Sequence, residues 1–178
     1  MSQGLHPVVP EAAPPWGDIS QWREANAALA DLIERKASRL ERAYREAGYI
    51  EGLLRDTAPL MDRLGHRTCR SCAEPCCLRV KAWFDFRDLL FLQLSKGPVP
   101  LAQMLPGLEA VCRYLTETGC SLPRLARPWI CTWYLCPGQT ELLRRELPRD
   151  SLRISRAWEE IKAARKRMER AFIETVTA

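Results

Sequence analysis

The sequence predicts a mainly α-helical protein in which long N- and C-terminal helices pack as an antiparallel pair beside a small, irregular cysteine-rich region with short helices. Both ends of the chain show apolar residues at helical spacing. All eight cysteines lie between residues 69 and 136, and prolines and glycines interrupt the segments around them. The expected parts of this single globular unit are a mobile Pro-rich leader (1–17), N-terminal helices (18–64), the cysteine-rich region (65–138) and C-terminal helices (139–178).

The leader contains four of the 13 prolines, which fix φ and remove backbone donors, so we expect it to be extended and mobile. A long helix should then begin at Asp18 or Ser20, both good N-caps, and end near Gly48, with its continuation through residues 49–55 as the alternative. Its apolar stripe consists of Ile19, Trp22, Leu29, Leu32, Ile33, Leu40, Tyr44 and Ala47. Pro59 fits the first turn of a separate short helix that Thr57 caps and that ends near Leu64.

Short elements are expected in the middle of the chain. The stretch RDLLFLQLSKG predicts a helix capped by Asp85 and stopped at Gly97. A second short helix is indicated by the helical spacing of Leu108, Val111, Cys112 and Leu115, with Gly119 as its C-cap. The alternative for this stretch is a small hairpin that turns at Thr118-Gly119.

The C-terminal part predicts a brief helix around Glu141–Leu147 and a long one from Asp150 or Ser151 to about Thr175. The stripe of the long helix is Ile154, Trp158, Ile161, Met168 and Phe172. Its other faces carry Arg153, Arg156, Arg165, Lys166, Arg167 and Arg170. Each long helix can bury its stripe against the other.

Composition narrows the classes of partner and compartment. The net charge is +5, and residues 121–178 carry the whole excess, with 12 basic against 7 acidic residues. Aromatic residues are not interleaved with these basic residues, so nucleic acid is not an expected partner. The chain shows neither a secretory signal nor an apolar run of about 18 residues, so we expect no membrane partner and a cytoplasmic protein.

The cysteines are the candidate metal ligands: Cys69, Cys72, Cys76, Cys77, Cys112, Cys120, Cys131 and Cys136. Cytosolic thiols stay reduced or bind metal, which favours metal over disulfides. Two residues separate Cys69 from Cys72, a step that lets two sulfurs reach one zinc ion, and iron–sulfur clusters also use closely spaced cysteines. Cofactor and arrangement stay open: zinc or an iron–sulfur cluster such as 4Fe-4S, in one centre or two.

Five arginines lie close in sequence to the cysteines: Arg70, Arg79, Arg113, Arg124 and Arg127. Four thiolates around a metal leave net negative charge, which such arginines could offset. The alternative is that they are solvated surface residues.

The spacing Cys69-x2-Cys72-x3-Cys76-Cys77, followed by Gly119-Cys120 and Arg127-Pro128-x2-Cys131, resembles the YkgJ-type CxxCxxCC family of zinc- or iron-chelating proteins. The resemblance covers about residues 69–138. This chain has three residues, where the family has two, between the second and third cysteines. The family is mostly bacterial, and its relation to flagellin lysine methylases implies an iron–sulfur centre.

Three functions follow as hypotheses. The first is a metal-binding protein with a redox, sensory or structural role. The second is an accessory or catalytic part of a methyltransferase-like enzyme, although the chain has no nucleotide-binding loop and only two histidines, and we identify no catalytic residue. The third is a metal-stapled interaction module that docks a protein partner through the basic C-terminal helix.

Overall fold

The computed structural model describes residues 14–69, 72–73, 75–117 and 119–178, and it leaves the side chain of Cys76 undescribed. Most of the expected leader, residues 1–13, therefore lies outside the described residues. The protein is mainly α-helical, as predicted. The described part contains six α-helices: α1 (Ile19–Arg35), α2 (Glu41–Thr68), α3 (Phe86–Leu94), α4 (Trp129–Trp133), α5 (Pro137–Glu146) and α6 (Pro148–Val176). No helix in these ranges is long and apolar enough to cross a membrane.

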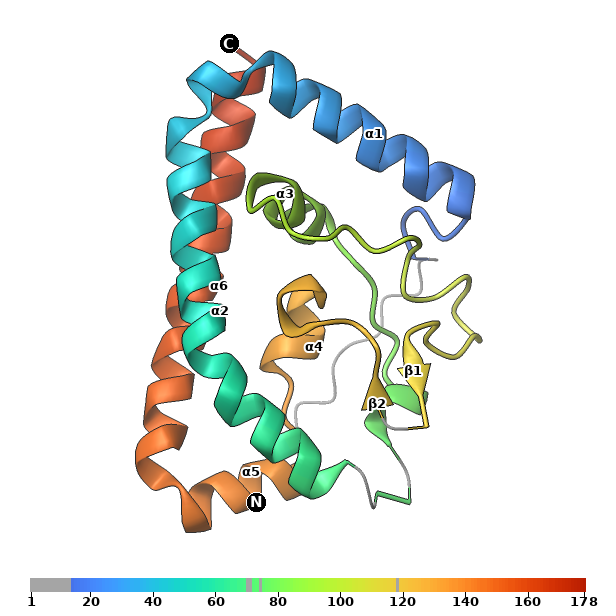
Figure 1. Ribbon diagram of the computed structural model, residues 1–178, viewed down its shortest axis with the longest axis vertical. Helices are drawn as coiled ribbons and strands as arrows, with labels where there is room; N and C mark the ends of the chain where they lie inside the picture. Colours follow the sequence, from blue (N-terminus) through green and yellow to red (C-terminus); the bar gives the residue numbers. More distant parts are fainter. Residues whose placement is uncertain (1–13, 70–71, 74, 118) are drawn as a thin grey trace.

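Helices α2 and α6 pack as a long antiparallel pair along one side of the molecule (Figure 1). Most of the stripe of α6 is buried as predicted, with Ile161 and Met168 fully inaccessible to solvent, whereas Trp158 is half-buried. From α2, Ala43, Ala47 and Ile50 are buried in the same core. Burial of one such aliphatic side chain contributes about 1.5–3 kcal/mol, so this interface is a main source of stability.

The predicted N-terminal helix is wrong in its boundaries. The chain turns through a 3-10 segment (Ala37–Arg39) and the fully buried Leu40, so the helix ends at Arg35 instead of Gly48. Helix α1 then crosses the top of the molecule and packs on α3 (Figure 1). The apolar stripe continues past the turn, which is why spacing alone does not reveal the break.

The separate short helix capped by Thr57 is also wrong, because α2 continues through Gly48 and Pro59 to Thr68. A proline inside a helix removes one hydrogen bond. Here the Thr57 hydroxyl donates back to the carbonyls of Leu53 and Leu54 at 2.9 and 3.2 Å. Packing of α2 on α6 and α5 offsets the lost bond, a tertiary effect that local signals do not contain.

Helix α3 begins as predicted, at an Asp85 N-cap. The Asp85 carboxylate accepts from the Asp88 N–H at 2.8 Å, and the Asp88 carboxylate accepts from the Asp85 N–H at 3.0 Å. This reciprocal capping box fixes the first turn. The helix ends at Leu94, three residues before Gly97.

The helix predicted before Gly119 is absent from the described residues. A hairpin is present instead, as the alternative predicted, but Gly119 pairs with Thr116 as the first residue of its second strand and does not lie in the turn. Strands β1 (Leu115–Thr116) and β2 (Gly119–Cys120) pair antiparallel. The segment that leads into β1 is fixed by the Tyr114 hydroxyl, which donates to the Ala102 carbonyl at 2.8 Å and accepts from the Ala102 N–H at 3.1 Å. Gly119 has φ +116°, a conformation that favours glycine.

Candidate functional site

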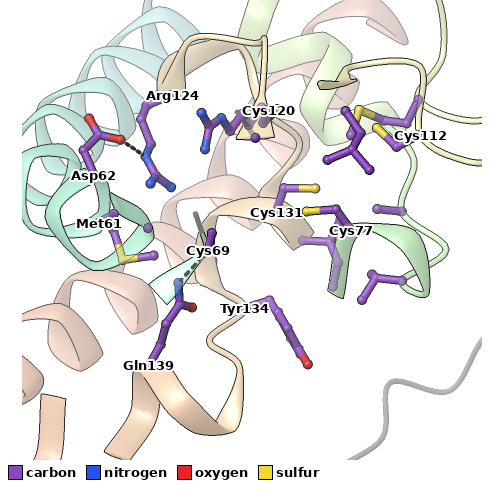
Figure 2. Close-up of a pocket in the computed structure, with 18 of the residues that line it drawn as sticks. Met61, Asp62, Cys69, Cys77, Cys112, Cys120, Arg124, Cys131, Tyr134 and Gln139 are labelled. Atoms are coloured by element: carbon purple, nitrogen blue, oxygen red, sulfur yellow. Dashed lines mark hydrogen bonds and ion pairs between the residues drawn. The ribbon is translucent and has the colours of Figure 1, made fainter. Parts of the chain in front are cut away.

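A cavity of about 440 Å³ lies between the C-terminal half of α2, the β1–β2 hairpin and α4 (Figure 2). Five cysteines line it: Cys69, Cys77, Cys112, Cys120 and Cys131. The remaining wall is largely apolar, with Met61, Val80, Ala82, Met104, Leu115, Ile130 and Tyr134 among its residues. The site is thus a sulfur-rich, mostly apolar cavity.

Each of these cysteines comes from a different local element. Cys69 is the C-cap of α2, and its N–H donates to Gly65 at 2.8 Å. Cys77 lies in a 3-10 turn (Cys76–Leu78), Cys120 in β2 and Cys131 in α4. Cys112 is half-buried in the loop before β1, not on the predicted helix. The fold therefore brings together thiols that are up to 62 residues apart in the sequence.

The other three predicted ligands lie elsewhere or are not described. Cys72 is exposed, and its sulfur does not line the cavity. Cys136 is the N-cap of α5, where its N–H donates to the Gln139 side-chain oxygen at 3.3 Å. The side chain of Cys76 lies outside the described residues, as does Arg70.

The cavity disfavours isolated thiolate charge. Burial raises the pKa of Cys112, and the nearby thiols of Cys120 and Cys77 raise it further. Burial raises the pKa of Cys131 far above its ordinary value, with added repulsion from Cys77, Cys120 and Cys112. Because each thiolate charge raises the cost of the next, the cluster can hold several thiolates together only beside a cation that offsets their charge.

Helix α4, which carries Cys131, is anchored by a buried charge pair. The Asp88 carboxylate accepts from the Trp129 N–H at 2.9 Å and from the Arg165 guanidinium at 2.7 Å. Arg165 also donates to Asp85 at 3.0 Å, and its guanidinium lies 5.8 Å from the centroid of the Trp129 ring. These contacts place the first turn of α4, and hence Cys131, relative to α3 and α6.

The position of Arg165 corrects the sequence prediction, which placed it on a face of the last helix other than the apolar stripe. Arg165 is 5% exposed. The sequence contains a signal for this burial. Arg165 follows Ile161 by four residues and precedes Met168 by three, so it lies on the buried stripe. A charge at that position indicates a buried partner, which is Asp88.

Gln139 is a further site residue that the sequence did not single out. Its amide nitrogen donates to the Thr68 hydroxyl at 3.1 Å and lies 3.6 Å from the Cys69 sulfur. Figure 2 shows Gln139 below Cys69, joined to it by a dashed line. The amide links the end of α2 to the start of α5, so it holds Cys69 at the cavity wall.

The described residues do not form a closed coordination sphere. Within residues 14–178 apart from the undescribed positions, no group of three or more His, Cys, Asp or Glu residues could hold a metal ion as it stands. Cys69, Cys112, Cys120 and Cys131 are free thiols. Thiol donors suit zinc, copper(I) and iron–sulfur clusters, so the chemistry of the donors fits such a group although the sulfurs are not drawn together.

No family model matches the chain, and neither the curated proteins nor the solved structures contain a match.

Proposed function

We propose that the protein binds a zinc ion or an iron–sulfur cluster through Cys77, Cys112, Cys120 and Cys131, and that this centre has a redox, sensory or structural role. The observation that carries the proposal is that thiols from separate segments line one cavity. A half-buried cysteine is ordinary in a core, but five cysteines in the wall of one cavity, three of them half-buried, are not explained by packing alone.

The choice of four ligands follows from the mutual electrostatic effects of the thiols. Cys77, Cys112 and Cys120 all contribute to the raised pKa of Cys131. Four thiolates complete the coordination of zinc or of a 4Fe-4S cluster. Rotation about χ1 moves each sulfur between staggered positions without a change of backbone, and the proposal requires such rotations to bring the four sulfurs to a common centre. Cys69, beside Gln139, is the adjacent fifth thiol.

The metal would supply electron transfer if it is an iron–sulfur cluster, and a structural crosslink if it is zinc. The resemblance to the CxxCxxCC family supports both, and its relation to flagellin lysine methylases supports the cluster. Thiolate ligands need a reducing compartment, so the proposal places the protein in the cytosol.

Metal content tests the proposal. Protein purified without oxygen should contain either iron and sulfide with broad visible absorption, or about one zinc per chain without colour. Elemental analysis and absorption spectroscopy distinguish these outcomes. Metal-free protein that takes up neither zinc nor a reconstituted cluster would reject the proposal.

Matched cysteine variants test the ligand set. Cys112→Ser and Cys131→Ser should each lose most of the bound metal, because serine is a poor ligand for soft metals. Cys136→Ser is the control, because its sulfur does not line the cavity, and it should retain the metal. Loss of metal in Cys72→Ser would indicate a second centre that includes the CxxC step.

A further inference from the structure

One wall of the cavity is formed by two arginines, Arg124 and Arg127, which the metal proposal does not use. The Arg124 side chain is only 16% exposed, and its Nε donates to the Asp62 carboxylate at 2.6 Å. The Nε of Arg127 donates to the Leu122 carbonyl at 2.9 Å. Both guanidiniums are therefore oriented through Nε, the nitrogen nearest the side-chain stem.

The outer nitrogens of both guanidiniums remain available. Neither Arg124 nor Arg127 uses Nη1 or Nη2 in a hydrogen bond within the described part of the chain. The Arg124 Nη2 lies over Gly65 of α2, where an added Cβ would be 3.7 Å away. Figure 2 shows the Arg124 guanidinium beside Asp62, to which a dashed line joins it, and above Met61. Fixed guanidiniums with open N–H groups are typical of carboxylate and phosphate recognition.

The charge on this wall is unbalanced. Asp62 is the only acidic residue among the described residues lining the cavity, and its side chain is 60% exposed to water. Burial lowers the pKa of Arg124, and repulsion from Arg127 lowers it further. A half-buried pair of like charges is stabilised by an anion that bridges them. The arginines that the sequence placed near the cysteines thus divide, because the exposed Arg79 and Arg113 do not line the cavity.

The remaining surface suits a ligand with an apolar body. Met61, Met104, Ile130 and Tyr134 line the cavity beside the arginines. A volume of about 440 Å³ falls within the range of small-molecule sites, roughly 300–1,000 Å³, and exceeds what a single ion needs. The cavity therefore combines a cationic wall, an apolar interior and a group of thiols.

We propose that Arg124 and Arg127 form an oxyanion subsite that binds the carboxylate or phosphate of a small molecule, whose apolar body then lies against the thiol cluster. As a substrate or effector site next to a metal centre, it rests on the proposed function. Binding of the anion itself needs only the arginines. The competing role for them is to offset the charge of metal-bound thiolates, because Arg124 also interacts electrostatically with Cys120.

Three small aromatic probes test the subsite: benzoate, phenyl phosphate and the neutral benzyl alcohol. Saturation-transfer NMR and calorimetry should detect binding of at least one anion to the full chain, in both metal-free and metal-loaded protein. Benzoate and phenyl phosphate distinguish a carboxylate site from a phosphate site. Benzyl alcohol should bind at least about tenfold more weakly than the preferred anion, since it lacks the charge-assisted bonds. Equal binding of all three probes would overturn the proposal.

Variants locate the binding. Arg124→Gln and Arg127→Gln should each weaken binding of the preferred anion about tenfold or more, whereas Arg124→Lys, which keeps the charge but loses the planar fork, should weaken it less. Arg144→Gln is the matched control, because Arg144 is 70% exposed and pairs with Glu141 on α5. Circular dichroism and thermal unfolding check that each variant folds. If one of the two glutamine variants does not fold, the other glutamine variant and Arg124→Lys provide the test. Unchanged affinity for the anion in both of these variants would overturn the subsite.

The outcomes separate the two proposals. Anion binding that is present without metal and absent once metal is bound would assign the arginines to charge compensation and overturn the subsite. Anion binding that depends on both arginines, in a protein that takes up no metal, would support the subsite and reject the metal centre.

Discussion

The pair of helices α2 and α6 and the cysteine-bearing loops are held together in different ways. In the α2–α6 pair, both helices bury regular stripes of aliphatic residues along most of their length. In the loops, elements as short as the five-residue α4 and the two-residue strands are positioned by individual hydrogen bonds and one buried charge pair. Many small contributions stabilise the α2–α6 pair, whereas a few specific contacts stabilise the loops.

The comparison explains where a site can form. A continuous apolar interface fills its own space and leaves no cavity. The loops leave about 440 Å³ between elements and direct thiols and guanidiniums into it. Gln103 shows how such a region is held: it is fully buried, and its amide donates to Phe84 and Pro15 while it accepts from two backbone N–H groups.

The largest effect is expected where the two regions meet, at Asp88. Asp88→Ala leaves the Arg165 charge buried beside the half-exposed Asp85 only, so the free energy of unfolding should fall by about 3–5 kcal/mol. Denaturant titration measures the loss. The control is Glu174→Gln, which removes one charge from the exposed pair that Glu174 of α6 forms with Arg42 of α2, and it should cost at most about 1 kcal/mol. Similar losses in the two variants would contradict the special role of the buried pair.

Asp88 should also give the stability a specific pH dependence. Burial raises its pKa to about 6, more than the attraction of Arg165 lowers it, against 3.8 in the unfolded chain. Between about pH 4 and 6 the folded protein therefore binds the extra proton, and the contribution of Asp88 to stability falls as the pH rises through this range. Denaturant titrations of the wild type and Asp88→Asn should differ in slope there and run parallel above pH 7. Parallel curves throughout would show that Asp88 keeps an ordinary pKa.

Gly119 tests how the loops depend on special backbone geometry. Its φ of +116° is strained for any residue with a Cβ, although an added Cβ would meet nothing within 4 Å. Gly119→Ala should therefore destabilise the protein by about 1–3 kcal/mol through the backbone alone. Thermal unfolding measures the change, and an unaltered transition would argue against this turn.

A glycine-to-alanine substitution in α2 should change the stability in the opposite direction. Gly48 lies inside α2, and an added Cβ would meet nothing within 4 Å. Gly48→Ala should stabilise the protein by about 0.5–1 kcal/mol, because alanine loses less backbone entropy in a helix. Calorimetry can detect the higher transition temperature. A lower one would mean that α2 is interrupted near Gly48, as the sequence predicts.

The sequence by itself determined the helical class, the N-cap at Asp85 and the long C-terminal helix with its stripe. These features depend on residues within about four positions of one another, a range that local spacing reports. The sequence also identified a sulfur-rich middle segment as the candidate site, on residue type alone.

Only the tertiary structure decided that α2 continues through Gly48 and Pro59, that a hairpin replaces the helix before Gly119, and that Asp88 is the buried partner of Arg165. It also decided which cysteines share a cavity and that Arg124 and Arg127 line it. Each depends on contacts between segments tens of residues apart, such as Arg165 with Asp88 or Arg124 with Asp62. The free energy of these contacts outweighs local preferences. Helical spacing indicates that Arg165 lies on the buried stripe, but it does not identify Asp88 as its partner.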